Sequence, residues 1–130
     1  MPDIRRIFPT EAPTPRGPYS PAVQAGDYIF VSGQGPVDPV TDKMIFGPVE
    51  LETRRTLTNI KLILEAAGAS LEDVVSVRVF LKDPADFAAM NSVYQEFFGE
   101  QKPARTTVGT MLPNPEMKVE IDCVAYKPRG

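Results

Sequence analysis

The hydrophobic pattern changes its period along the chain, and each period predicts a type of element. Residues 22–25 and 28–32 have the pattern of two short strands around the turn Gly26-Asp27, which favours a hairpin. The next stretch, 33–48, is rich in Gly and Pro and is predicted to be a loop. Its Gly33-Gln34-Gly35 segment lacks the third glycine and the following helix of a dinucleotide-binding motif, so we exclude that motif.

Two helices and a strand are predicted in the middle of the chain. Apolar residues every three or four positions, followed by a glycine stop, predict the first helix: Leu57, Ile60, Leu64, Ala67 and Gly68. Strict alternation predicts the strand: Val75, Val77, Val79 and Leu81. Asp83-Pro84 supplies an N-cap and a first helical proline for the second helix, which ends at Gly99. Its aromatic stripe is expected to face the core: Phe87, Met90, Tyr94 and Phe97.

Two further strands, 104–109 and 118–126, complete the predicted set. One side of the last strand is apolar and is assigned to the helices: Val119, Ile121, Cys123 and Ala125. Its other side is mixed: Lys118, Glu120, Asp122, Val124 and Tyr126. In the preceding strand Arg105 and Thr107 share one side. The expected class is therefore α+β, a mixed sheet with two helices on one face.

The face without helices needs an explanation, because Val124 and Tyr126 stand among its charges. A symmetric oligomer that covers this face is our working hypothesis. A solvated sheet in a monomer is the alternative.

Prolines crowd the first 21 residues, and this predicts an extended arm or a sheet edge over 1–21. The 130 residues correspond to one domain, 1–130, which is long enough to bury a core without disulfides.

Composition excludes several kinds of chemistry. The chain has no His and one cysteine, Cys123, so histidine-dependent triads, an internal disulfide and a multi-thiolate metal site are excluded. The net charge of −3, with no basic stripe, argues against nucleic acid as a partner. No run of ~20 apolar residues and no secretory signal is found, so we expect no membrane association and a cytoplasmic protein. Cys123 is expected to be an inert core residue.

Arg105 and Glu120 are the candidate functional pair. Arg105 stands in a strand-like run after Pro103, where a charge implies a partner or a ligand, and its planar guanidinium matches a carboxylate. One interpretation is a structural ion pair between Arg105 and Glu120, or two separately solvated charges. The other is an anionic substrate held by Arg105, with Glu120 orienting or deprotonating a water. Tyr19, Ser32 and Asn91 are weak candidates by residue type alone.

Taken together, many segments in the same order resemble the reactive intermediate deaminase (Rid/YjgF) family of enamine/imine deaminases. The segments include Gly17-Pro18-Tyr19-Ser20, Phe30-Val31-Ser32-Gly33-Gln34, Glu65-Ala66-Ala67-Gly68, Asp86-Phe87, Asn91, Pro103-Ala104-Arg105 and Val119-Glu120-Ile121. The resemblance is to RidA-like members and covers nearly the whole chain.

The resemblance implies a chorismate-mutase-like fold, a homotrimer with active sites between subunits, and no cofactor or metal. It also implies that Arg105 binds the carboxylate of a 2-imino acid such as 2-iminopropanoate or 2-iminobutanoate, or of the enamine 2-aminoacrylate. Glu120 would activate the hydrolytic water, and Tyr19, Ser32, Gly33, Asn91 and Thr107 would line the pocket. Thr107 stands where Cys is frequent, and Pro21 and the loop 111–117 also depart from the common pattern, with consequences for substrate size.

The implied activity is hydrolysis of reactive imines released by pyridoxal-phosphate enzymes, a metabolite damage-control role that yields 2-oxo acids and ammonia. Two alternatives remain open at this point. One is a non-enzymatic trimer that binds 2-oxo acids or a protein partner, as in members described as translation inhibitors or chaperone-like. The other is a deaminase acting on an aminomuconate-type substrate.

Overall fold

The computed structural model describes residues 3–128, which form one six-stranded sheet. Its strands are β1 (Ile4–Ile7), β2 (Ala22–Ala25), β3 (Tyr28–Gln34), β4 (Val74–Leu81), β5 (Ala104–Gly109) and β6 (Val119–Tyr126). The spatial order is β1-β2-β3-β6-β4-β5. β4 and β5 pair in parallel, and the other neighbours are antiparallel.

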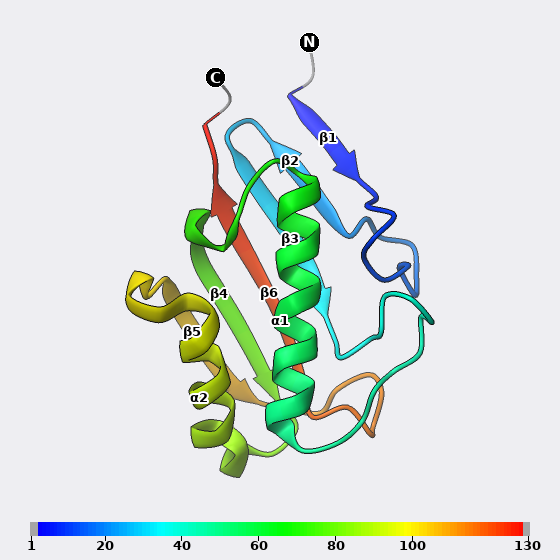
Figure 1. The fold of residues 1–130 in the computed structure, drawn as a ribbon, viewed down its shortest axis with the longest axis vertical. Coiled ribbons are helices and arrows are strands. Elements are labelled where there is room, and N and C mark those ends of the chain that lie inside the picture. The colour runs from blue at the N-terminus through cyan, green and yellow to red at the C-terminus, as the bar shows by residue number, and fades with distance from the viewer. Residues whose placement is uncertain (1–2, 129–130) are drawn as a thin grey trace.

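Two helices lie on the same face of this sheet, α1 (Val49–Ala66) and α2 (Phe87–Phe98), and leave the other face without a helix (Figure 1). Three short 3-10 turns, Leu71–Asp73, Pro84–Asp86 and Gly99–Gln101, lie in the connections. This arrangement confirms the α+β class and the two-helix layer expected from the sequence. α2 connects β4 to β5, because parallel neighbours require a crossover.

The core lies between α1 and the centre of the sheet. Fully buried side chains of α1 face fully buried side chains of the strands: Leu57, Ile60, Ile63 and Leu64 on the helix, and Ile29, Val79 and Ile121 on the sheet. Burying each such side chain contributes about 1.5–3 kcal/mol relative to an exposed one. The helix ends as predicted, with Ala67 at the C-cap and Gly68 at φ 84°.

The N-terminal half follows the expected pattern closely. β2 and β3 form the predicted hairpin, with Gly26 at φ 59° in the turn. β1 lies at the edge of the sheet, within the proline-rich arm, and pairs with β2. The predicted loop 33–48 is shorter than expected because β3 continues to Gln34. The Asn59 amide on α1 donates hydrogen bonds to the carbonyls of Gly35 and Val37, at 3.2 and 2.8 Å, and so holds this loop.

Two details of burial differ from what the sequence pattern suggests. Val75 is exposed, because the pairing of β4 with β6 shifts register between Val74 and Ser76 and turns Val74 to the core instead. Phe87 is 46% exposed at the start of α2, so its predicted place in the core is wrong, whereas Phe97 is partly buried and packs against the core as expected. Val93 and Phe98 share the core side of this helix with Met90 and Tyr94, as they are buried alongside them.

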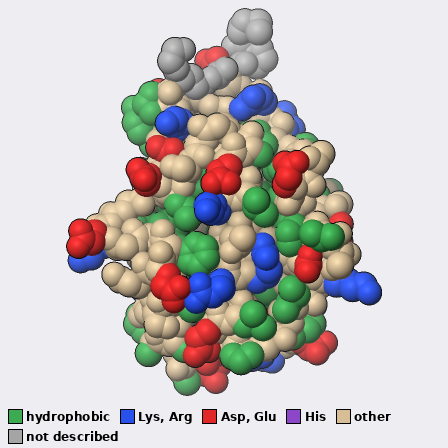
Figure 2. Space-filling model, in the orientation of Figure 1, with side chains coloured by type: hydrophobic (Ala, Val, Ile, Leu, Met, Phe, Trp, Pro, Cys, Tyr) green, Lys and Arg blue, Asp and Glu red, His purple; other side chains and the backbone are tan. Residues whose placement is uncertain are grey.

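The helix-covered side carries acidic and basic side chains intermixed with apolar ones, without a field of one sign (Figure 2). Arg54 of α1 and Glu96 of α2 form a two-bonded ion pair on the surface, at 2.8 and 3.0 Å. Within residues 3–128, neither helix is long and apolar enough to cross a membrane.

Candidate active site

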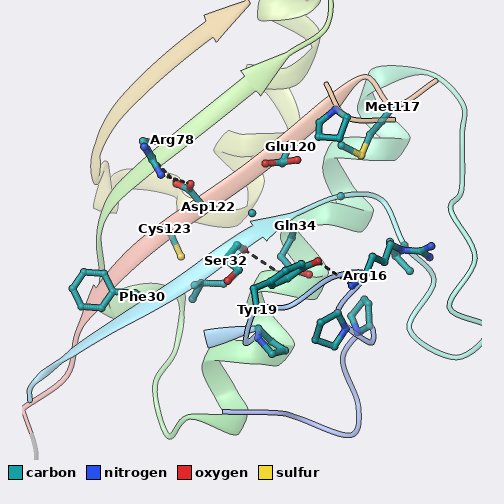
Figure 3. A pocket seen from close by; sticks show the side chains of 18 of the residues that line it. Arg16, Tyr19, Phe30, Ser32, Gln34, Arg78, Met117, Glu120, Asp122 and Cys123 are labelled. Atoms are coloured by element: carbon teal, nitrogen blue, oxygen red, sulfur yellow. Dashed lines mark hydrogen bonds and ion pairs between the residues drawn. The ribbon is translucent and has the colours of Figure 1, made fainter. Parts of the chain in front are cut away.

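A groove of about 900 Å³ lies between the N-terminal arm and the helix-free side of β3 and β6. Glu120 of β6 lines it together with Ser32 and Gly33 of β3 and Tyr19 of the arm (Figure 3). The loop 111–117 contributes Pro113, Asn114 and Met117 to the same groove. Four of the predicted site residues therefore share one surface.

Glu120 is partly buried, and burial raises the pKa of its carboxyl group above the usual glutamate value. The neighbouring carboxylate of Asp122, two residues along the same side of β6, raises this pKa further. Asp122 is itself held by Arg78 of β4 in a two-bonded ion pair, with N–O distances of 3.0 and 2.7 Å. Glu120 therefore holds its proton more strongly than an exposed glutamate does.

The backbone of β3 makes room for this carboxyl group. Gly33 packs against the Glu120 side chain, and any β-carbon at this position would crowd it. The preceding residue, Ser32, ties the strand to the arm. Its hydroxyl donates to the carbonyl of Ser20 at 2.6 Å, and its amide donates to the carbonyl of Pro21 at 2.9 Å.

The arm forms the opposite wall of the groove and is fixed by its own hydrogen bonds. The Tyr19 hydroxyl accepts from the amide of Arg16 at 3.2 Å. Thr14 donates its amide and hydroxyl to the carboxylate of Asp42, at 3.0 and 2.7 Å, and these bonds lower the pKa of Asp42. The Arg16 guanidinium donates to the carbonyl of Asp42. The arm is thus held to the loop after β3 and keeps Tyr19 at the groove.

Arg105 lies elsewhere, in a smaller pocket of about 280 Å³ that also contains Asn91 and Tyr94. In the sheet register both Arg105 and Cys123 are paired with Val77, so the Arg105 side chain is on the helix-covered face. The guanidinium carbon lies 4.6 Å from the centre of the Tyr94 ring and 5.5 Å from that of Phe87. Within residues 3–128 Arg105 forms no ion pair.

Arg105 and Glu120 are therefore on opposite faces of one sheet, because Glu120 pairs with Phe80, on the alternate side of β4 from Val77. This register contradicts the interpretation of an Arg105–Glu120 ion pair within the chain. The predicted site residues fall into two sets: Tyr19, Ser32, Gly33 and Glu120 in the groove, and Asn91 and Arg105 in the pocket. Thr107 is on the face of Arg105, and its hydroxyl is buried without a hydrogen-bond partner.

Three residues near these sets were not recognised as site neighbours from the sequence. Asp122 stands two residues from Glu120, so strand alternation could have identified it. Phe87 and Tyr94 were interpreted only as core positions of the second helix. Cys123 is buried as expected, and burial raises the pKa of its thiol to about 12. Among residues 3–128 no three His, Cys, Asp or Glu side chains gather as metal ligands.

A family model described as endoribonuclease L-PSP matches residues 9–127. The solved structure of RidA from the Antarctic bacterium Psychrobacter superposes with a TM-score of 0.89, at 39% identity over 94% of this chain and 98% of that one. The chain belongs to the Rid/YjgF family. This confirms the resemblance stated from the sequence.

Other Rid/YjgF relatives cover the chain to a similar extent. A RutC family protein of Pyrococcus horikoshii is 51% identical, over 93% of this chain and 96% of its own. A 2-iminobutanoate/2-iminopropanoate deaminase of Dermatophagoides farinae is 42% identical, over 92% and 94%. The 3-aminoacrylate deaminase RutC of Acinetobacter baylyi is also 42% identical, over 92% and 95%. Deaminases are thus among the relatives of this chain.

Proposed function

We propose that this chain is a hydrolytic deaminase that converts reactive 2-imino acids and their enamine forms to 2-oxo acids and ammonia. One observation carries the proposal. Arg105, which has no ion-pair partner among residues 3–128, and Glu120, a carboxyl group of raised pKa, lie on the two faces of one sheet. These are the two groups that hydrolysis of an anionic imine requires. The relatives named as imine and aminoacrylate deaminases support the same reaction class.

A homotrimer with sites between subunits would bring the two groups together. The Glu120 groove of one subunit would then face the Arg105 pocket of the next. The helix-free face supports such an assembly, because it exposes large apolar side chains. Phe30 is 47% exposed and Tyr126 is 43% exposed, and Tyr126 contacts Tyr28 with ring centres 5.2 Å apart.

The proposed roles follow from the chemistry of each group. Arg105 binds the substrate carboxylate through two parallel hydrogen bonds. Glu120 accepts a proton from water as the water oxygen bonds to the imine carbon. It passes this proton to the imine nitrogen, which gives a carbinolamine. Glu120 then takes the remaining proton from the carbinolamine hydroxyl and delivers it to nitrogen as the carbon–nitrogen bond breaks, so imine plus water yields 2-oxo acid plus ammonia. The raised pKa of Glu120 suits both directions of this transfer. Tyr19, Ser32, Gly33, Asn91 and Thr107 would shape the cavity around the substrate.

The chemistry demands little else from the protein. An iminium carbon beside a carboxylate is already electrophilic, so orientation of the anion and of one water supplies most of the rate gain. The reaction as written needs no metal or organic cofactor.

A coupled assay tests the proposal. A threonine or serine dehydratase generates the short-lived imine, and the release of 2-oxo acid is timed with and without this protein. Arg105→Ala and Glu120→Ala should each reduce the acceleration ~100-fold or more. Arg54→Ala and Glu96→Ala are matched controls, because they remove the same side-chain types from an exposed ion pair.

Two outcomes would contradict the proposal. The first is release at the rate of solvent hydrolysis for every imine tried, and the second is wild-type acceleration by both site variants. Saturable binding of a 2-oxo acid without turnover would favour the non-enzymatic binding alternative instead.

A further inference from the structure

Arg105 is held by aromatic rings and not by carboxylates. Its guanidinium carbon is 4.6 Å from the ring centre of Tyr94 and 5.5 Å from that of Phe87, within the range of cation–π attraction for both rings. A cation among partly buried groups normally has an acidic partner, yet Arg105 has none among residues 3–128. The two rings therefore supply the contacts that set the orientation of this side chain.

Both rings come from one face of α2. Phe87 and Tyr94 are seven residues apart, which is two helical turns, so their side chains project in the same direction over β5. Phe87 is 46% exposed, so packing into the core does not explain a large aromatic residue at this position. Its contact with Arg105 does explain it.

The Tyr94 ring is itself fixed. It is 9% exposed and packs on Phe98 with ring centres 4.7 Å apart. Its buried hydroxyl forms no hydrogen bond of regular geometry among residues 3–128. Burial raises the pKa of this hydroxyl, and the neighbouring Arg105 cation partly opposes that shift. A rigid ring of this kind gives the guanidinium a defined plane to lie against.

We infer that Phe87 and Tyr94 are positioning residues that hold the faces of the Arg105 guanidinium and leave its N–H donors to a substrate carboxylate. The inference rests on the proposed function, since it assumes that Arg105 is the anion-binding group. A planar guanidinium can lie against a ring and still form two hydrogen bonds in its own plane, whereas a lysine ammonium cannot. The rings therefore favour Arg over Lys at position 105.

The test uses the full chain with Phe87→Leu, Tyr94→Leu and Tyr94→Phe. Phe97→Leu is the matched control, because it makes the same change on the same helix at a ring that packs against the core. Phe87→Leu and Tyr94→Leu should each raise the KM for the imine ~3- to 10-fold and change kcat less than ~2-fold. Tyr94→Phe keeps the ring and should recover most of the KM lost in Tyr94→Leu. In an Arg105→Ala background, Phe87→Leu should add no further loss.

A second measurement separates the two proposals. The Kd of 2-oxobutanoate, measured by calorimetry, should rise in Phe87→Leu by the same factor as KM. If the wild-type chain binds 2-oxobutanoate through Arg105 without turnover, the deaminase proposal fails, and the Kd values alone decide the role of the rings. If Phe87→Leu lowers only the Tm, with KM and Kd equal to those of Phe97→Leu, the positioning role is wrong. Absence of both binding and turnover would overturn both proposals.

Discussion

A methyl group on Gly33 would overlap Oε2 of Glu120 and lie 3.0 Å from its Cδ. The side chain of Glu120 on β6 therefore lies directly over the backbone of β3. The neighbouring register shift between Val31 and Gln34 interrupts the regular pairing of these two strands at this point. A glycine here gives the carboxyl group its space in the groove.

Gly33→Ala should reduce kcat ~10- to 100-fold, because the Glu120 carboxylate must move away from its water. The free energy of unfolding should change little, because Gly33 is not in the left-handed region and the crowded atom ends a flexible side chain. Steady-state kinetics and urea unfolding measure both quantities. In a Glu120→Gln background, Gly33→Ala should reduce kcat almost no further. A further loss of kcat as large as in the wild-type background would show that Gly33 does not act through Glu120.

Subunit mixing should restore activity if the proposed composite site is correct. Arg105→Ala and Glu120→Ala trimers should each be inactive, but unfolding and refolding them together creates interfaces with both native groups. Random assembly in equal amounts should yield about a quarter of the wild-type sites. Activity of the mixture that stays at the level of the separate variants would mean that one subunit supplies both groups.

Asp122→Asn should move the acidic limb of the kcat/KM profile to lower pH. Glu120 must be ionised to accept a proton from water, so activity falls as pH decreases through its pKa. Burial and the Asp122 charge both raise that pKa, and removing the charge cancels the second contribution only. The limb should therefore stay above the range of an exposed glutamate. Glu96→Gln, which neutralises a carboxylate on the helix-covered side, should leave the limb in place.

Glu52→Ala should lower the free energy of unfolding by about 2–4 kcal/mol, measured by urea titration. The Glu52 carboxylate is fully buried on α1 and accepts hydrogen bonds from the amides of Lys118 and Gly47, at 2.7 and 3.2 Å. Removing it leaves both amides without an acceptor. Glu50→Ala changes an exposed carboxylate on the same helix and should have a much smaller effect.

Most helices and strands were predictable because the spacing of apolar residues and the position of turn residues are local features of the sequence. The hairpin of β2 and β3, the stop of α1 at Gly68, and the apolar side of β6 depend on neighbours in the sequence. Val75 was not predictable in this way. Its exposure follows from how β4 pairs with β6, where Val74 is opposite Ala125 and Ser76 opposite Val124. This register shift depends on the pairing with β6 and not on the sequence of β4 alone.

The sequence indicated candidate site residues but not which of them lie together in the fold. Alternation places Glu120 on the side of β6 away from the apolar set, and the sequence analysis used this. Alternation within one strand cannot show that Arg105 and Glu120 lie on opposite faces of the sheet. β5 and β6 are not neighbours, and their faces are related only through β4, where Val77 is paired with both Arg105 and Cys123. The contact of Phe87 with Arg105 could not be predicted for the same reason, since Arg105 comes from β5.

The place of β6 in the sheet has a consequence for folding during synthesis. β6 lies between β3 and β4, so residues 119–126 provide the only hydrogen-bonded link between the two parts of the sheet in residues 3–128. A nascent chain that lacks them has two separate sheet fragments with unpaired edges. Such fragments expose β3 and β4 to wrong pairing. The cooperative fold can therefore form only after the ribosome has released the segment around residue 126, and chains stalled earlier should be sensitive to proteases.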